Sequence, residues 1–174
     1  MFFDRCRENV EIWTEYHPYY QSLNKKLIEE SKEFSFVKNL ICDDGAPTNI
    51  KALQTHNNIE SPTLSLITQW IVSLMQGKYN SSYTIKDRWI TKYNKGDYTL
   101  SHCHQPFAFA FNYFIKSPKG SSPLVLTTSG KRVKSDEGKV VIFPAGVWHH
   151  VPQNKCEGRM TLAGNIYYNN ILGK

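Results

Sequence analysis

The sequence contains few cysteines, and their spacing matches no disulfide or metal-binding motif. Cys6, Cys42, Cys103 and Cys156 are scattered along 174 residues without a C-x-x-C pair. Secreted domains that are held together by disulfides usually carry more cysteines at more regular spacings. We therefore expect reduced thiols and a cytoplasmic protein.

Long apolar segments are also missing. The longest, LITQWIVSLM, is much shorter than the roughly 20 residues that a helix needs to cross a bilayer. The first residues, MFFDRCREN, lack the cationic and then apolar pattern of a signal peptide. These two absences predict a soluble protein without a membrane partner.

The positive charge of the chain is not concentrated in any one segment. The net charge is +6, but lysines and arginines occur in short groups such as NKKL and GKRVKS, without a long basic block or an RNA-binding signature. We expect a dispersed positive surface and no nucleic-acid partner. Internal repeats and low-complexity segments are absent too, and a chain of this length is expected to form one domain, residues 1–174.

The first third of the sequence favours helices. YYQSLNKKLIEESKEF places apolar residues at helical spacing with charges between them. SPTLSLITQWIVSLMQGKY offers Ser61 as an N-cap, Pro62 at the first helical position and Gly77 as its end. We therefore expect residues 1–81 to be a mainly helical support region. The apolar stripe that should pack on a sheet consists of Leu64, Ile67, Ile71 and Leu74.

From residue 82 the hydrophobic period changes to that of strands. Short β-branched or aromatic runs alternate with turn-forming segments such as NKGD, SPKGSS and PQNKCEG. Strands at such spacing after a helical start predict helices packed outside a β-sandwich or barrel, with residues 82–174 as the β core. The expected strand segments are YTIKDRWITKY, YTLSHCH, FAFAFNYFI, SPLVLTT, GKVVIFPA and MTLAGNIYY.

Two histidines stand one residue apart in the segment SHCHQPF. In an extended strand alternate side chains share a face, so His102 and His104 would point one way and Cys103 the other. That arrangement suits a metal ion. It also suits two partly exposed strand residues, so the spacing alone leaves both interpretations open.

A further histidine pair follows in VVIFPAGVWHHVPQN. A buried strand over residues 140–143 should end at the proline that follows, which places His149 on a neighbouring strand. Two facing antiparallel sheets would bring His149 toward His102 and His104, and three neutral imidazoles could hold a first-row metal. His150 should face away, although a register slip would exchange the two.

Arg159 and Thr161 open the last strand segment, RMTLAGN. Because they alternate, they share a face of the strand. A planar guanidinium beside a hydroxyl grips a carboxylate well, since arginine offers paired donors in fixed geometry. Arg159 could instead pair with a surface acid such as Glu157.

The order of these segments resembles that of the Fe(II)- and 2-oxoglutarate-dependent oxygenases, more narrowly the prolyl-4-hydroxylase-like branch with its uncharacterised phage and marine bacterial members. The similarity runs from about Trp89 to Asn165 and consists of WITKYNKGDYTLSHCH, NYFI, GKVVIFPAGVWHHV and RMTLAGN, in the family's order. It implies a double-stranded β-helix, the jelly roll of the cupins, with iron at its open end. If a phage encodes the chain, its location would be the host cytoplasm.

The resemblance implies a metal site made of His102, His104 and His149. The first and last fall on the family's two histidine ligands, whereas His104 stands where most members have aspartate, so that H-x-H replaces H-x-D. A neutral nitrogen in place of an anionic oxygen leaves the site one unit more positive, which alters iron affinity and redox potential. Asp97, before His102, could supply a carboxylate only with an unusual strand geometry.

The resemblance also implies a binding site for 2-oxoglutarate. Arg159 and Thr161 match the pair that holds the far carboxylate of this cosubstrate. Tyr93 and Tyr113 match tyrosines that support it. Asn165 could orient the site from the last strand or could be a structural hydrogen-bonding residue.

The implied function is that of an enzyme, a non-haem iron dioxygenase that couples oxidative decarboxylation of 2-oxoglutarate to hydroxylation of a second substrate. It would require Fe(II), 2-oxoglutarate and O2, and its second substrate would be a prolyl or other peptide residue, or a metabolite. A three-histidine cupin-like dioxygenase that does not use 2-oxoglutarate would explain H-x-H but leave Arg159 and Thr161 without a role. A jelly-roll binding module with a degenerate metal site would explain the missing carboxylate.

Overall fold

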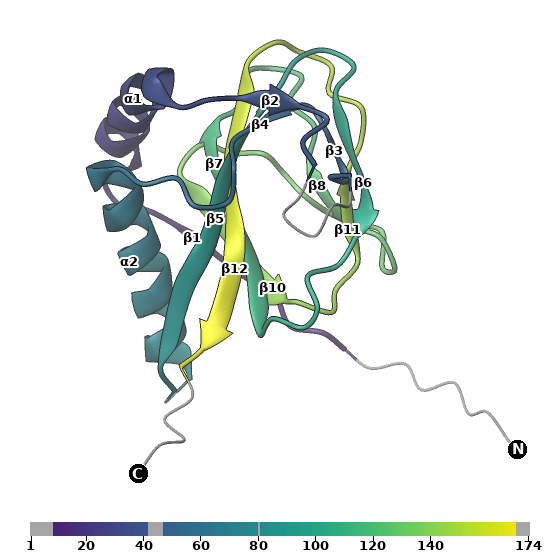
Figure 1. The fold of residues 1–174 in the computed structure, drawn as a ribbon. Coiled ribbons are helices and arrows are strands. Elements are labelled where there is room, and N and C mark those ends of the chain that lie inside the picture. The colour runs from purple at the N-terminus through teal and green to yellow at the C-terminus, as the bar shows by residue number, and fades with distance from the viewer. Residues whose placement is uncertain (1–8, 42–46, 80, 170–174) are drawn as a thin grey trace, which may run out of the picture.

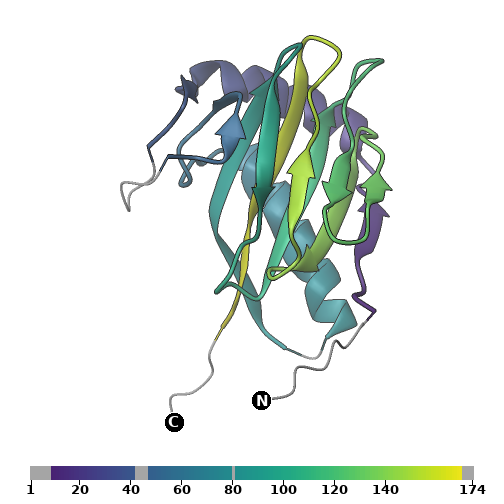
Figure 2. The same cartoon turned by 90° about the vertical axis from the view of Figure 1, so that its right-hand side faces the viewer.

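Two antiparallel β-sheets face each other, and two helices cover the outer side of the larger sheet (Figure 1). This computed structural model describes residues 9–41, 47–79 and 81–169. When the molecule is turned by 90°, the smaller sheet lies in front of the larger one and the helices lie behind both (Figure 2). The predicted packing of helices outside a two-sheet β core is confirmed.

The larger sheet has seven strands in the order β1-β10-β7-β12-β5-β4-β2. Its centre is built from three long strands rich in β-branched and aromatic residues, which pack well on a pleated surface. These are β5 (Tyr83–Tyr93), β7 (Phe109–Lys116) and β12 (Arg159–Tyr168). The flanking strands are β1 (Trp13–Tyr16), β2 (Val37–Lys38), β4 (Leu53–Gln54) and β10 (Lys139–Pro144).

The smaller sheet has five strands in the order β3-β6-β11-β8-β9. Its central strand β11 pairs with β6 on one side and β8 on the other. The β6–β11 pairing aligns His149, the first residue of β11, with His102, the last residue of β6. The five strands are β3 (Ile50–Lys51), β6 (Tyr98–His102), β8 (Leu124–Leu126), β9 (Lys131–Val133) and β11 (His149–Val151).

The two helices form where the sequence predicts them. They are α1 (Tyr20–Glu30), extended by a 3-10 turn (Ser31–Glu33), and α2 (Pro62–Lys78). The Ser61 hydroxyl accepts a hydrogen bond from the backbone N–H of Leu64 at 3.2 Å, which confirms the predicted N-cap. α2 ends one residue later than predicted.

The N-terminal region also contributes four short strands that the sequence did not predict, β1 to β4. β1 pairs with β10 at the edge of the larger sheet, and β4 pairs with β5. Strands of two to four residues are too short to show a hydrophobic period. Pairing with longer strands of the core therefore decides where they form.

The structure bears on two expectations from the sequence, which concern the cysteines and the lack of a membrane-spanning segment. Cys103 and Cys156 are free cysteines, as predicted, whereas Cys6 and Cys42 lie outside the described residues. No helix in the described part of the chain is long and apolar enough to span a membrane.

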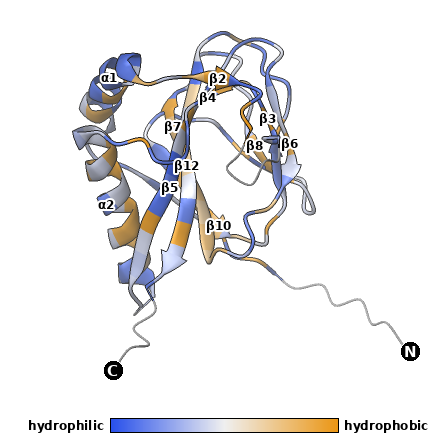
Figure 3. Ribbon diagram, in the orientation of Figure 1, coloured by the Kyte–Doolittle hydropathy of each residue, from blue (hydrophilic) through white to orange (hydrophobic). Residues whose placement is uncertain are grey.

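Hydrophobic layers lie on both sides of the larger sheet. One fills the space between the sheet and the helices, and the other lies between the two sheets. Successive residues of β7 alternate between them: Phe111 and Tyr113 belong to the helix layer, whereas Ala110 and Phe114 belong to the layer between the sheets. Figure 3 shows hydrophobic stretches on α2 and on neighbouring strands. The candidate site lies in the layer between the sheets.

Candidate metal centre

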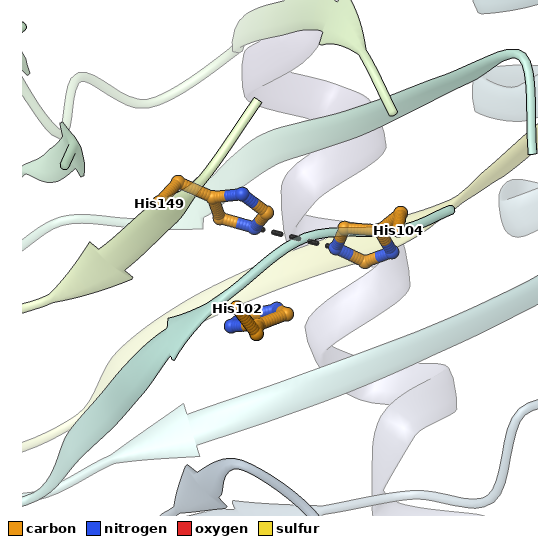
Figure 4. Close-up of side chains that lie close together, drawn as sticks. All are labelled: His102, His104 and His149. Atoms are coloured by element: carbon orange, nitrogen blue, oxygen red, sulfur yellow. Dashed lines mark hydrogen bonds between the residues drawn. The ribbon is translucent and has the colours of Figure 1, made fainter. Parts of the chain in front are cut away.

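Three histidines converge between the sheets. His102 ends β6, His149 begins β11, and His104 follows two residues after the end of β6. One ring nitrogen from each lies within 4.8 Å of the others, and Figure 4 shows the rings turned toward a common centre. The three predicted ligands are therefore brought together by the fold.

The route by which His104 reaches the cluster differs from the prediction. We expected His102 and His104 to share one face of an extended strand, but the strand ends at His102. The backbone N–H of His104 instead donates to the carbonyl of Ala145 at 2.7 Å. The imidazole of His104 stacks on the indole of Trp89, with ring centroids 5.9 Å apart and an interplanar angle of 14°.

Hydrogen bonds to backbone carbonyls fix the tautomers of two of the imidazoles. His102 Nδ1 lies 2.8 Å from the carbonyl oxygen of Leu100, and His149 Nδ1 lies 2.9 Å from that of Val147. A carbonyl can only accept, so in both rings Nδ1 carries the proton. Nε2 is then left with a free lone pair.

The tautomer of His104 is fixed by a side chain. Its Nδ1 lies 2.7 Å from Asn165 Oδ1, an acceptor, so its Nε2 also carries a free lone pair. Nε2 of His104 and Nε2 of His149 are 3.3 Å apart, the approach marked by the dashed line in Figure 4. Two imidazole nitrogens that bind one metal ion at 2.0–2.1 Å lie about 3.2 Å apart, so the spacing fits a shared cation.

Burial keeps the three imidazoles neutral. The pKa of His104 falls to about 4 and that of His149 to about 3, because burial disfavours the charged form and neighbouring histidines repel a further charge. Burial also lowers the pKa of His102. Neutral imidazole is the form that binds metals, so the cluster is ready for a cation at pH 7.

Asp97 and His150 take no part in the cluster. Asp97 Oδ2 accepts a hydrogen bond from the backbone N–H of Asn94 at 2.9 Å, and its Oδ1 lies 3.4 Å from Lys38 Nζ. His150 faces away, as predicted, with its Nδ1 2.9 Å from the hydroxyl of Thr127. His149 is therefore the histidine of this pair that joins the cluster.

Arg159 is completely buried, and no described residue provides a counter-ion for its charge. Its guanidinium carbon lies 4.4 Å from the ring centroid of Tyr93 and 5.8 Å from that of Phe114. Within the described part of the chain, none of its three side-chain nitrogens has a hydrogen-bond partner. Glu157, the alternative partner, instead accepts from the backbone N–H of Lys95 at 3.2 Å.

Such a guanidinium is costly to bury. Burial lowers the pKa of Arg159, although the phenol of Tyr93 opposes this shift. An unpaired buried charge destabilises a protein by several kcal/mol, so it is usually compensated by an anion. An acidic ligand beside Arg159 would supply this compensation.

Thr161 and Tyr93 line a cavity that leads toward the histidines. The cavity is narrow, about 30 Å³. The Tyr93 hydroxyl lies 2.8 Å from Thr99 Oγ1, a hydrogen bond that holds its ring over Arg159. The lining residues are Ile50, Trp89, Thr91, Tyr93, Thr99, His102, Asn112, Leu124, His149, Val151, Thr161 and Ala163.

The assignment of Tyr113 to this site is wrong. Tyr113 lies in the helix layer, and its hydroxyl donates to Asn24 Oδ1 at 2.7 Å. Side chains alternate along β7, so the residue that faces the cavity is its neighbour Asn112. Both faces of β7 are buried, and an apolar pattern could not tell which one faces the site.

Two further donors of the cavity were not predicted. Trp89 Nε1 and Asn112 Nδ2 are buried, and both lack a hydrogen-bond partner among the residues that the structure describes. Buried donors are normally paired, and a ligand with several acceptor atoms would supply the missing partners. The sequence did carry a signal for Asn112, because it is an isolated polar residue within the apolar run FAFAFNYFI.

No protein-family model matches the sequence, and no curated protein matches it either. Solved structures do match. The viral collagen prolyl hydroxylase vCPH from Paramecium Bursaria Chlorella virus-1, in a 2OG complex, has a TM-score of 0.69 and 14% sequence identity, covering 89% of this chain and 94% of that chain. A prolyl-4-hydroxylase from Pseudomonas putida has a TM-score of 0.69 and 13% identity, covering 91% of this chain and 92% of that chain.

A third match is HygX from Streptomyces hygroscopicus with nickel and 2-oxoglutarate bound. Its TM-score is 0.69 at 9% identity, covering 92% of this chain and 84% of that chain. The fold is that of the 2-oxoglutarate- and Fe(II)-dependent oxygenases. The predicted double-stranded β-helix is thereby confirmed, whereas the roles of the side chains follow from the site itself.

Proposed function

We propose that this protein is a non-haem iron oxygenase that couples oxidative decarboxylation of 2-oxoglutarate to hydroxylation of a second substrate. The observation that carries the proposal is Arg159, a buried cation for which no described residue provides a counter-ion, in the same layer as three histidines with free Nε2 lone pairs. A dicarboxylic keto acid could place one carboxylate on Arg159 and its keto-acid end on a metal ion held by the histidines. The fold of the matching oxygenases supports this assignment.

The residues of the centre have the chemistry to bind both Fe(II) and 2-oxoglutarate. His102, His104 and His149 would hold Fe(II), since neutral imidazoles suit first-row metals and the Nε2 spacing suits one ion. When bound, Fe(II) supplies with O2 the oxidative chemistry of the site. Beyond these three histidines we assign no catalytic residue.

Arg159 and Thr161 would bind the far carboxylate of 2-oxoglutarate. Paired guanidinium donors match a carboxylate in geometry, and the cavity places Thr161 on the same face of β12. Tyr93 covers the guanidinium and keeps water from it. Trp89 and Asn112 offer two more buried donors for the remaining oxygens of the ligand.

The narrow cavity sets a requirement on binding. A cavity of about 30 Å³ is far smaller than the roughly 300 Å³ or more of typical ligand pockets, so we expect the lining side chains to move apart when 2-oxoglutarate enters. We expect binding of 2-oxoglutarate to be slower than diffusion for this reason.

We propose a prolyl or other peptide residue as the second substrate. Two of the structures described above are prolyl hydroxylases by name, which favours this class over a small metabolite. We also propose that the protein works in the cytoplasm, a phage-infected host included, since Cys103 and Cys156 are free thiols.

The test is an anaerobic titration with Fe(II) and 2-oxoglutarate, followed by visible absorption. The expected result is a charge-transfer band of the keto acid on iron that disappears in Arg159→Ala. Arg132→Ala, which removes an exposed arginine on β9, should leave the band unchanged. His104→Ala should weaken metal binding, and unchanged metal content would remove His104 from the ligand set.

The alternatives give different outcomes in the same titration. Iron binding that does not respond to the keto acid would support a three-histidine cupin-like dioxygenase. Failure to bind iron would support a degenerate binding module. Either result contradicts the proposed function.

A further inference from the structure

His104 differs from the other two histidines in what holds its ring. His102 and His149 are each held by the backbone carbonyl of the residue two positions earlier. His104 is held by the side chain of Asn165, which comes from β12 in the opposite sheet. His104, which stands where the related H-x-D motif has aspartate, is thus the only one of the three histidines held by a described side chain, that of Asn165.

Asp87 determines which way the amide of Asn165 points. Asn165 Nδ2 donates to Asp87 Oδ2 at 3.3 Å, and the hydroxyl of Tyr167 donates to the same oxygen. A carboxylate only accepts, so the NH2 group must face Asp87 and the amide oxygen must face His104. A flipped amide would instead turn its oxygen toward the carboxylate of Asp87, so that two acceptors would face each other.

The backbone is shaped to bring Asp87 to this place. The register between β12 and β5 shifts so that Gly164 pairs with Arg88 and Ile166 with Ile85, leaving two residues of β5 opposite Asn165. Such bulges re-aim side chains next to functional sites. A Cβ atom on Gly164 would lie 2.5 Å from the backbone oxygen of Asp87, so only glycine permits this close approach.

No described basic side chain neutralises the charge of Asp87. Among the ion pairs of the described residues, none involves Asp87. The neighbouring Arg88 is directed to Glu60 at 3.6 Å, and Lys86 lies over the ring of Tyr167. The negative charge is therefore free to act through Asn165 on His104.

We infer that Asp87 is a positioning residue that acts through Asn165 on His104, and that it restores from outside the ligand set the negative charge that H-x-H lacks. This inference rests on the proposed function, because His104 must be a metal ligand. A carboxylate behind a metal-bound imidazole orients the ring and makes its nitrogen a stronger donor to the metal. Here the amide of Asn165 transmits the effect.

The test combines a readout without metal and one with metal. In the metal-free protein, nitrogen-15 NMR of the histidine rings reports which nitrogen carries the proton. Asp87→Asn should lower the fraction of His104 that is protonated at Nδ1 and leave His102 and His149 unchanged. Calorimetric titration with Co(II) should show about 10- to 100-fold weaker binding.

An exchange of the two side chains gives a sharper test. Asp87→Asn combined with Asn165→Asp moves the carboxylate one position inward, where it can accept directly from His104 Nδ1. This double variant should regain the Nδ1-protonated tautomer and a Co(II) affinity near that of the unmodified protein. Glu60→Gln is the control, since it removes a nearby negative charge that does not contact Asn165, and both readouts should stay unchanged.

Two outcomes would overturn the inference: Asp87→Asn that keeps both the tautomer and the Co(II) affinity, or an exchange that fails to restore them. Thermal unfolding of each variant shows whether a loss of Co(II) affinity is caused by misfolding. If Asp87→Asn misfolds, the double variant decides whether the carboxylate acts on His104. If the unmodified protein binds no Co(II), the proposed function fails. The tautomer of His104 still tests the link to Asp87 in that case.

Discussion

The two faces of β7 carry neighbouring polar residues, one with its hydrogen bonds satisfied and one without a described acceptor for its N–H group. Tyr113 faces the helices, and its hydroxyl donates to Asn24 Oδ1 at 2.7 Å, while Asn24 Nδ2 donates to the carbonyl of Ile115, also at 2.7 Å. Asn112 faces the other sheet, and no described residue accepts a hydrogen bond from its Nδ2. One strand therefore supports stability on one face and offers a free donor on the other.

The same contrast holds for the two layers as a whole. The helix layer consists of tightly buried aliphatic and aromatic side chains such as Leu27, Ile71 and Phe111. The layer between the sheets contains a buried guanidinium, Arg159, and an indole, Trp89, whose polar atoms lack partners in the described chain. Hydrophobic burial in the first layer offsets the cost of the unpaired polar groups in the second.

The largest effect on stability is expected in the helix layer. Ile71→Ala leaves a cavity at a fully buried position and should lower the free energy of unfolding by about 2–5 kcal/mol. Co(II) affinity should not change. Urea unfolding measures the first quantity and calorimetry the second. Leu66→Ala is the control, since Leu66 is 54% exposed on the same helix. Metal affinity that falls with stability would show that the two layers are coupled.

In the layer between the sheets, a substitution to an apolar residue should raise the free energy of unfolding instead of lowering it. Arg159→Met replaces a buried, unpaired charge by an apolar side chain of similar length, so the free energy of unfolding should rise by about 1–4 kcal/mol. Binding of 2-oxoglutarate should be lost. Unfolding curves and the anaerobic absorption titration check both. A destabilised variant would instead mean that packing of the guanidinium on Tyr93 and Phe114 outweighs its desolvation.

The smallest effects are expected from the two neighbours on β7. Tyr113→Phe removes one buried hydrogen bond and should cost about 1 kcal/mol of stability without changing the affinity for 2-oxoglutarate. Asn112→Ala should weaken binding of 2-oxoglutarate about fivefold, the equivalent of one hydrogen bond, with little effect on stability. Equal effects of both substitutions on binding would remove the distinction between the two faces.

Sequence reasoning located the two helices and the longer strand segments for local reasons. The N-cap at Ser61 depends only on neighbouring residues, and it was predicted correctly. Tyr113 was misassigned because both faces of β7 are buried, so hydrophobicity does not mark the face of the site. The donors Trp89 and Asn112 became recognisable only when their partners were seen to be missing.

Local patterns in the chain were thus sufficient for the two helices, the longer strand segments and a two-sheet β core, since caps, turns and side-chain periods act over a few residues. The jelly-roll class and the set of three histidines followed from the family resemblance. The three-dimensional fold decided which groups meet: the position of His104 after its strand, the isolation of Arg159, and the contact of Asp87 with Asn165, 78 positions apart. Strand register and a bulge set these contacts, and both depend on how distant segments pair.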